Sequence, residues 1–323
     1  MRVKKWGRSA ILLVWLALVF GVASTWGASF PERPVRFLVG FNPGGGTDQV
    51  ARIIAPKLSE RWAQSVIVEN RPGADGDIAL GILMSSEPDG YTLVMATNAF
   101  TITPNLRKLN YDPIKSFSPI ILVASVPGVL AVRGSLPVSS LKELIALAKS
   151  KPGQLNFASS GTGTTPYLQM ALLMKLTGID MVHIPYKGNV GPPLLSGEVD
   201  MGFSGVPALL ALVKAGRIKA LAVSTTERAA QLPEVPTVAE AANLPGYEAF
   251  TWYGVLGRVG TPKEIINKLN ADISEVMRDP TARQRISNSG FLIVAGSPEK
   301  FSATIKSDVA RWSALLKTID IVK

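Results

Sequence analysis

Short apolar segments alternate with helix-like segments along most of the chain. Several apolar segments are nearly continuous and do not alternate with polar residues, which is typical of strands buried on both faces of a parallel sheet. Strands separated by helices indicate βαβ units, so the pattern predicts a doubly wound α/β fold. The predicted strands cover residues 35–39, 66–68, 92–96, 120–124, 129–132, 155–158, 181–184, 219–223 and 292–295.

Capping residues mark the predicted helix starts. Ser140, Thr237 and Thr261 are each followed three positions later by Glu, which is the spacing of a capping box. Ser297 precedes another helix-like segment that opens with proline. Pro56 lies inside a helix-like segment and predicts a kink or a restart there.

Two interruptions of the apolar pattern indicate the domain organisation. The segment Ser-Val-Pro-Gly at 125–128 separates two apolar runs, and a return crossing fits near residues 250–254. We therefore predict a first domain formed by residues 28–126 and 252–323. Residues 127–251 would form a second, inserted domain, with both crossings acting as hinges.

The first 27 residues are typical of a secretory signal peptide. A basic start is followed by an apolar run at 10–23 and by small residues, so we expect cleavage near Gly27 or Ala28. The apolar run is shorter than the roughly 20 residues that span a bilayer, which favours export to the periplasm over a membrane anchor. The chain has no cysteine, which excludes disulfides and a lipid-modified cysteine.

The chain is basic, with a formal net charge of +10, but the basic residues do not form a nucleic-acid motif. Four of these charges stand within the first eight residues, and no run of Lys and Arg is interleaved with aromatic residues. We therefore expect no nucleic-acid partner.

Three consecutive glycines, Gly44 to Gly46, follow the first predicted strand and precede a helix-like segment. Glycines allow a sharp turn and leave backbone N–H groups accessible, and Thr47 or Asp48 would cap the helix. The N-terminus of a helix favours a carboxylate or a phosphate. A simple tight turn between strand and helix explains the loop alone equally well.

A second loop of the same kind follows the strand predicted at 155–158. It is rich in Ser, Thr and Gly, and Pro166 marks the helix start after it. Two such loops, one in each predicted domain, would close on one small anion from opposite sides.

The chain resembles the Bug proteins, the extracytoplasmic receptors of tripartite tricarboxylate transporters. The resemblance begins with Phe-Asn-Pro-Gly-Gly-Gly-Thr-Asp at 41–48 and extends in order over essentially the whole mature chain. Further matching motifs lie at 68–74, 89–93, 111–113, 158–164, 185–188, 232–237 and 252–254. The resemblance implies a two-lobed, type II periplasmic-binding-protein (Venus-flytrap) fold, each lobe a mostly parallel sheet flanked by helices. It also implies a receptor that captures a small carboxylate and delivers it to a membrane permease, and we expect it to be a monomer.

The resemblance also implies which residues hold the carboxylate. The two glycine loops would supply backbone and hydroxyl groups, while Thr97 and Asn98 would line the same cleft. Of the aromatic residues Phe41, Phe100, Tyr186 and Trp252, which could wall the cleft or belong to the core, Phe41 is favoured because it adjoins the glycines. The predicted ligand-binding residues are Phe41, Gly45, Gly46, Thr47, Asp48, Thr97, Asn98, Ser159, Ser160, Gly161, Thr162, Thr164, Tyr186 and Ser204.

The chain departs from the family pattern at three places. Tyr167 stands where family members often carry His, and Ser204 lies in a stretch where they often carry Asp. Because an ammonium group in a closed cleft needs a carboxylate partner, Ser204 favours a ligand without an amino group, such as a dicarboxylate or an aromatic acid. Asp75 and Asp77 occupy a segment that is usually glycine-rich, and the sequence alone gives no account of them.

An enzymatic function is not indicated. His183 is the only histidine and lies within a predicted strand, where a packing or surface role is commoner than that of a general base. No Gly-x-Ser-x-Gly elbow, phosphate-binding Gly-x4-Gly-Lys loop or Ca²⁺ loop occurs, and one His without Cys excludes ordinary zinc sites. We expect no metal and no cofactor. Transport and ligand sensing without transport remain alternatives that the sequence does not separate.

Overall fold

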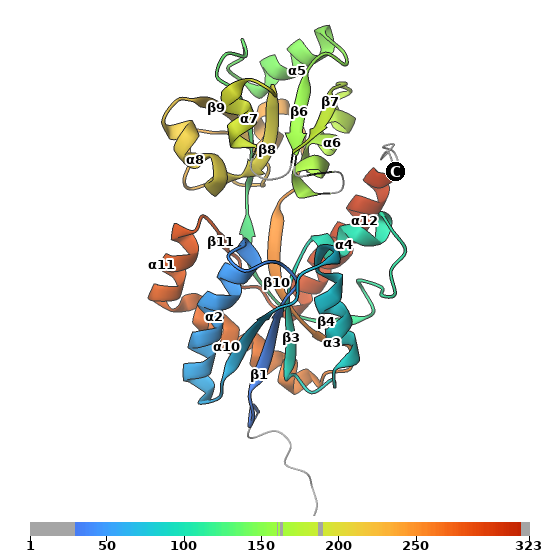
Figure 1. The fold of residues 1–323 in the computed structure, drawn as a ribbon, viewed down its shortest axis with the longest axis vertical. Helices are drawn as coiled ribbons and strands as arrows, with labels where there is room; N and C mark the ends of the chain where they lie inside the picture. The colour runs from blue at the N-terminus through green and yellow to red at the C-terminus, as the bar shows by residue number, and fades with distance from the viewer. Residues whose placement is uncertain (1–29, 160, 162–163, 187–189, 318–323) are drawn as a thin grey trace, which may run out of the picture.

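The computed structural model describes residues 30–159, 161, 164–186 and 190–317, so the predicted signal peptide lies outside the described residues. The described chain forms two α/β lobes that are stacked along the long axis of the molecule (Figure 1). Among the described residues, no helix combines the length and the apolar composition needed to cross a membrane.

The first lobe contains a six-stranded mixed sheet in the order β11-β4-β10-β3-β1-β2. Strand β1 pairs in parallel with β2 and β3, whereas β10 runs antiparallel to β3 and β4. The strands are β1 (Val35–Val39), β2 (Val66–Asn70), β3 (Thr92–Thr97), β4 (Phe117–Val126), β10 (Thr251–Arg258) and β11 (Leu292–Ile293).

Helices cover both faces of this sheet because each presents an apolar side to it. The helices α2 (Gly46–Trp62), α10 (Lys263–Arg278) and α11 (Pro280–Asn288) pack on one face. The helices α3 (Asp77–Ser85), α4 (Ala99–Ile102) and α12 (Pro298–Leu316) contribute to the core on the other face. Two 3₁₀ turns, η1 (Ala74–Gly76) and η2 (Thr103–Asn105), precede α3 and follow α4.

The second lobe contains a five-stranded mixed sheet in the order β7-β6-β8-β5-β9. Its strands are β5 (Gly128–Arg133), β6 (Asn156–Ser159), β7 (Val182–Pro185), β8 (Met201–Gly205) and β9 (Ile218–Val223). Parallel pairing joins β6 to β7 and β8, and antiparallel pairing joins β5 to β8 and β9. The helices α5 (Leu141–Ser150), α6 (Thr165–Thr177) and α9 (Val238–Ala242) pack on one side, and α7 (Gly191–Ser196) and α8 (Val206–Lys214) on the other.

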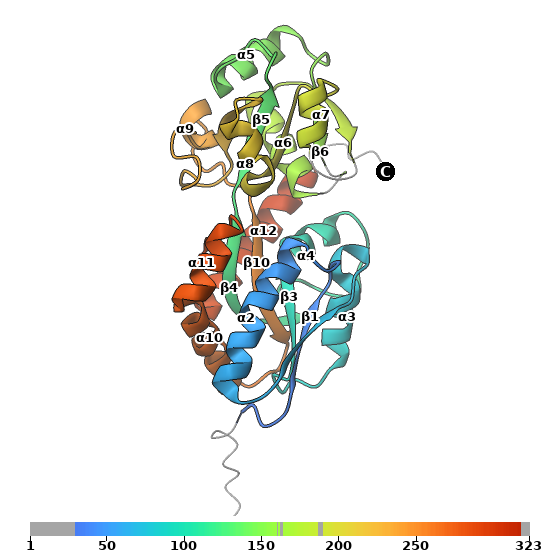
Figure 2. The ribbon, with the colours of Figure 1, turned by 60° about the vertical axis from the view of Figure 1, so that its left-hand side comes forward.

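Three segments connect the lobes. The chain passes from β4 to β5 through Pro127 and returns along the segment that leads into β10. Helix α12 then extends from the first lobe towards the second (Figure 2), where Trp312 and Leu315 join the apolar core that contains Leu168 and Tyr247. Helix α12 therefore contacts both lobes, in addition to the two segments that cross between them.

The predicted α/β class is confirmed, but both sheets are mixed and not mostly parallel as expected, because β10 and β5 each pair antiparallel with both neighbours. All nine predicted strands are present with ends shifted by up to three residues. Strand β8 was not predicted, and β10 was anticipated only as a crossing. Ser140, Thr237 and Ser297 cap their helices as predicted, since each side-chain oxygen accepts a hydrogen bond from the third residue of the helix. The cap predicted at Thr261 is wrong, because Pro262 occupies the cap position and the Thr261 hydroxyl donates to the Arg258 carbonyl. Helix α2 continues through Pro56, so the predicted restart is wrong as well.

Candidate functional site

The first glycine loop connects β1 to α2 at the carboxyl end of the sheet. Gly44 has a positive φ of 83°, which L-residues rarely adopt. The helix begins at Gly46, and Gly45 occupies the cap position without a side chain, so the prediction that Thr47 or Asp48 caps the helix is wrong. The first-turn N–H groups have no acceptor within the helix and face the loop.

Asp48 braces the loop from within the helix. Its carboxylate accepts hydrogen bonds from the Gly44 N–H at 2.9 Å, from the Arg52 Nε at 2.9 Å and from the Asn70 Nδ2 at 2.9 Å. Asn70 Nδ2 also donates to the Phe41 carbonyl at 3.1 Å. Burial alone would raise the pKa of Asp48, but these hydrogen bonds outweigh it and hold the pKa below its usual value. Asp48 is therefore an ionised residue that is almost fully engaged in holding the loop.

The adjacent glycines of this loop have different surroundings. A Cβ on Gly46 would lie 2.5 Å from the Tyr253 hydroxyl oxygen, so the absence of a side chain there is a packing requirement. A Cβ on Gly45 would meet only the Asn42 carbonyl, at 3.5 Å, and Gly45 has an ordinary φ of −71°. Packing of the fold therefore does not require glycine at position 45.

The second loop connects β6 to α6 and is closed by its own hydrogen bonds. Thr164 occupies the cap position of α6, and its hydroxyl donates to the Gly161 carbonyl at 2.7 Å. The Gly161 N–H donates to the Ser159 hydroxyl at 3.2 Å, and Gly161 has a φ of 128°. Ser160 and Thr162, which are also predicted to bind the ligand, lie outside the described residues.

His183 contacts this loop, which the sequence did not reveal. Its Nε2 lies 2.7 Å from the Ser159 hydroxyl oxygen, and its ring stacks on Phe157 at a centroid distance of 5.0 Å. Tyr167 meets the same ring edge-on at 4.8 Å. Burial lowers the pKa of His183, so the neutral imidazole is favoured. The signal for this contact is strand register, because Phe157 and His183 are partners in the β6–β7 pair.

Asn98 links the two lobes through its side-chain amide. Its Nδ2 donates to the Thr165 hydroxyl at 3.1 Å and to the Phe250 carbonyl at 3.2 Å. The neighbouring Thr97 hydroxyl accepts a hydrogen bond from the Ala99 N–H at 3.2 Å. Thr165, which is not among the predicted ligand-binding residues, thus connects the second glycine-containing loop to the end of β3.

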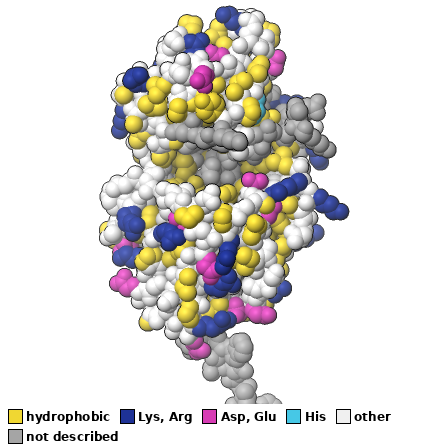
Figure 3. Space-filling view, in the orientation of Figure 1, with side chains coloured by type: hydrophobic (Ala, Val, Ile, Leu, Met, Phe, Trp, Pro, Cys, Tyr) yellow, Lys and Arg dark blue, Asp and Glu magenta, His cyan; other side chains and the backbone are white. Residues whose placement is uncertain are grey.

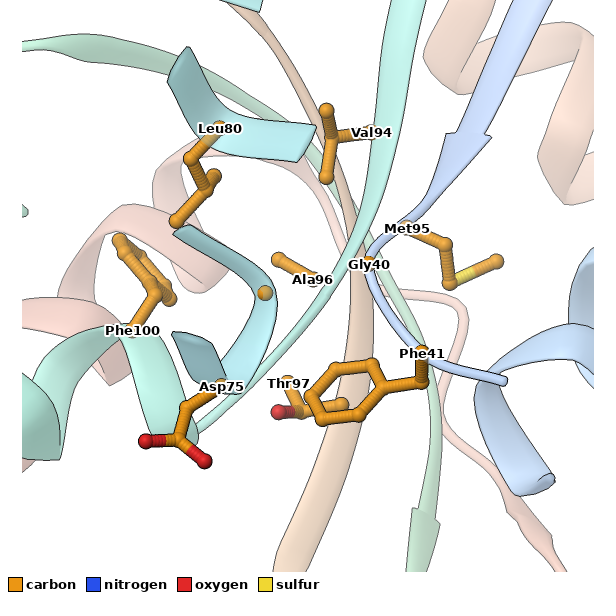
Figure 4. A pocket seen from close by; sticks show the side chains of 10 residues that line it. Gly40, Phe41, Asp75, Leu80, Val94, Met95, Ala96, Thr97 and Phe100 are labelled. Atoms are coloured by element: carbon orange, nitrogen blue, oxygen red, sulfur yellow. The ribbon is translucent and has the colours of Figure 1, made fainter. Parts of the chain in front are cut away.

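A small cavity of about 10 Å³ lies where β1 and β3 end. This volume is near the lower limit for one water molecule. Figure 4 shows the Phe41 ring beside the Thr97 hydroxyl, with the Asp75 side chain on the other side of Thr97. The cavity therefore lies between the first glycine loop and two neighbouring segments, which contribute Thr97 and Asp75 to its lining.

Other predicted residues are less closely associated with the glycine loops. The Tyr186 hydroxyl donates to the Glu198 carboxylate at 3.1 Å, although its N–H bonds the Ser159 carbonyl at 2.8 Å. Ser204 lies half-buried near the end of β8, opposite Val129. Trp252 is a core residue with 1% of its surface exposed, so the alternative that it walls the cleft is not supported.

Surface charge and metal-binding geometry offer no competing site within the described part of the chain. On the face drawn in Figure 3, Lys and Arg side chains are interspersed with Asp and Glu and do not form one basic patch. Among the described residues, no group of three His, Asp or Glu side chains could hold a metal ion.

Comparison with known proteins identifies close relatives. Residues 50–321 match TctC, the tripartite tricarboxylate transporter family receptor. The structure of Rhodopseudomonas palustris Rpa4515 with adipate is 36% identical, with a TM-score of 0.75 over 90% of this chain and 98% of that one. MatC (Rpa3494) from the same organism, with bound malate, is 31% identical, with a TM-score of 0.72 over 89% and 100% of the two chains. The periplasmic binding protein BugD is 33% identical, with a TM-score of 0.72 over 89% and 98%. The two lobes are thus similar to those of periplasmic binding proteins, as the motifs predicted.

Proposed function

The chain belongs to the tripartite tricarboxylate transporter receptor family, and we propose that it captures a small carboxylate between its lobes and delivers it to the permease of such a transporter. It is accordingly a solute-binding receptor and not an enzyme. The relatives with bound adipate and bound malate support a carboxylate ligand.

The observation that carries this proposal is the pair of loops at the N-termini of α2 and α6, one in each lobe. Each loop follows the carboxyl end of a parallel strand, where α/β folds commonly bind ligands. Each also ends at the positive pole of a helix of more than ten residues, which favours a carboxylate. The first-turn N–H groups at Gly46 and Thr47 would bind the acid from one side and the Gly161–Thr164 loop from the other.

In this proposal Asp48 and Ser159 act indirectly, because they hold the two loops in place. Asp48 is bound by Gly44, Arg52 and Asn70, so it holds the first loop in place and does not meet the anion itself. Ser159 has the corresponding role in the second loop, where it bonds both Gly161 and His183. Backbone N–H groups and hydroxyls then provide an uncharged site for an anion, as helix N-termini do elsewhere.

We place the protein in the periplasm. The relative BugD is a periplasmic binding protein, and the first 27 residues carry the pattern of an export signal. Amino-terminal sequencing of the exported protein would test this location: a mature chain starting near residue 28 is expected, and retention of the first residues on a cytoplasmic protein would contradict it.

A thermal-shift screen tests carboxylate capture. The purified mature protein is heated with mono-, di- and tricarboxylic and aromatic acids, and a true ligand raises the melting temperature because only the folded state binds it. Isothermal titration of each hit gives the affinity. A screen in which no acid changes the melting temperature would contradict the proposal.

Deletion of the gene distinguishes transport from sensing. If the receptor delivers its ligand to a permease, the deletion strain stops taking up the labelled acid that the purified protein binds. If uptake continues while a transcriptional response to the acid disappears, the protein is a receptor for signalling, and the delivery step of the proposal is wrong.

A further inference from the structure

Asp75 is an exposed acidic residue that helps to line the cavity beside the first glycine loop. Its side chain is 70% exposed, and the residue lines the cavity together with Phe41 and Thr97. In Figure 4 the Asp75 side chain lies on one side of Thr97 and the Phe41 ring on the other. The cavity beside the first glycine loop therefore has one negatively charged residue in its lining.

The turn that carries Asp75 is packed directly against the first glycine loop. A Cβ on Gly40 would lie 2.6 Å from the Gly76 Cα, so this close approach depends on the missing side chain. A Cβ on Gly76 would be 3.5 Å from the Phe41 ring, which places the ring in contact range of the turn. Ala74 and Asp75 both have positive φ, 49° and 57°, so the turn has a defined, uncommon backbone conformation.

Arg107 forms an ion pair with both Asp75 and Asp77, but its contact with Asp77 is the closer one. Its Nη2 donates to the Ala74 carbonyl at 2.7 Å and to the Asp77 carboxylate at 2.7 Å, but lies 3.7 Å from the Asp75 carboxylate. Asp77 also accepts a hydrogen bond from the Tyr111 hydroxyl at 2.9 Å. One guanidinium is thus shared between two carboxylates, so this group keeps a surplus negative charge, and Asp75 is the more weakly paired carboxylate.

We propose that Asp75 selects, among carboxylate ligands, those that also carry an ammonium group. This inference rests on the proposed function, because it needs one ligand carboxylate at the glycine loops. A second ligand carboxylate near Asp75 would be repelled, whereas an ammonium group would gain a charged hydrogen-bond partner. Asp75 thereby offers the carboxylate that Ser204 lacks, and it replaces the expectation of a ligand without an amino group.

The test compares ligands of similar length in pairs: succinate with 4-aminobutanoate, and adipate with 6-aminohexanoate. Isothermal titration of the wild-type protein is expected to favour the amino acid of at least one pair by roughly tenfold or more. Asp75→Asn, which keeps a residue that tolerates positive φ, should reduce that preference by about tenfold. Asp75→Gly should do the same without backbone strain.

Glu87→Gln is the matched control, because it removes one negative charge from an exposed residue beyond the other end of α3. The control should keep the wild-type preference. If both ligands of a pair bind and Asp75→Asn leaves their ratio unchanged, or if the wild type prefers the dicarboxylates, the inference is wrong while the proposed function stands. If no carboxylate of the wider screen binds, the proposed function fails and this inference fails with it.

Discussion

The side-chain nitrogen of Asn98 lies 3.1 Å from the hydroxyl oxygen of Thr165, and this hydrogen bond joins the end of β3 in the first lobe to the first turn of α6 in the second. Asn98 is 1% exposed, and its second hydrogen bond goes to the Phe250 carbonyl, where the chain re-enters the first lobe. One buried amide thus ties a proposed binding loop to a crossing between the lobes.

Thr165→Val should weaken carboxylate binding several-fold and lower the free energy of unfolding by about 1 kcal/mol. The substitution removes the hydroxyl that Asn98 bonds and leaves a buried amide with one partner fewer. Titration with the best acid from the screen and urea unfolding measure the two effects. Thr177→Val is the control, since that hydroxyl bonds the Leu173 carbonyl within the same helix. Equal losses of affinity in both variants would show that Asn98–Thr165 has no special part in binding.

The neighbouring glycines of the first loop should separate binding from stability. Gly45→Val is expected to keep the melting temperature close to that of the wild type and to abolish binding, because its side chain meets no packed neighbour but projects from the loop. Gly46→Ala is expected to lower stability by about 1–3 kcal/mol, because its Cβ would overlap the Tyr253 hydroxyl.

Tyr253→Phe in the Gly46→Ala background serves as the control for this mechanism. Removing the hydroxyl eliminates the contact at 2.5 Å and should restore part of the lost stability. A full loss of stability in Gly45→Val would instead assign both glycines to packing. Gly161→Val is a poorer probe of binding, because a φ of 128° strains any residue with a side chain.

Local patterns predicted most of the strands and both glycine loops, but two central strands depended on distant neighbours. Strand β8 contains two glycines, and a Cβ on Gly202 would lie 2.9 Å from the Ala158 carbonyl of β6. The glycine that makes β8 resemble a loop is therefore what allows it to pair inside the sheet. Strand β10 has a similar glycine, Gly254, which lies against the ring of Phe301 on α12.

The parts of the site that the sequence did not reveal are contacts across the sheet. Asp48 and Asn70 are 22 positions apart, and they meet because β1 and β2 are adjacent parallel strands. Ser159 and His183 meet because β6 and β7 are paired in a register that no local pattern fixes. The turn that carries Asp75 packs against the first loop because Gly40 has no side chain to collide with Gly76. Sequence motifs therefore located the loops, and tertiary packing determined what surrounds them.

His183 should make stability fall as the solution is acidified. Burial lowers its pKa below the usual 6.5, so the unfolded chain binds a proton more readily than the folded chain. Stability is therefore lost as the pH falls through 6.5 towards the lowered pKa. Tyr167 and the Ser159 hydroxyl contact the ring, and Lys175 lines the same hollow. None of these groups is a carboxylate that would favour the imidazolium. The difference in urea unfolding between the wild type and His183→Gln measures the effect, and a pH-independent difference would contradict it.

Two aspartates that both accept a hydrogen bond from a tryptophan indole should have opposite effects on stability. The Trp252 indole donates to Asp308 at 2.6 Å, and the Trp62 indole donates to Asp272 at 2.7 Å. Burial raises the pKa of Asp308 to about 6, although the Trp252 hydrogen bond and the Arg311 guanidinium, 4.0 Å away, act in the opposite direction. Burial would raise the pKa of Asp272 as well, but hydrogen bonds from Lys268, Trp62 and Arg61 outweigh it and lower the pKa.

Asp308→Asn should therefore raise stability above pH 7, while Asp272→Asn should lower it. The raised pKa of Asp308 means that its contribution is fully present below pH 3.8 and is lost as the pH rises through about 6, a cost of ~3 kcal/mol at higher pH. The lowered pKa of Asp272 means that its contribution is present above pH 3.8 and is lost in acid. Urea unfolding of both variants at pH 5 and pH 8, followed by tryptophan fluorescence, measures the two differences. The stabilisation by Asp308→Asn should shrink between pH 8 and pH 5, because the wild-type carboxyl becomes protonated. A gain in stability that stays constant, or a loss of stability at pH 8, would show that burial of the charged Asp308 carboxylate does not destabilise the fold.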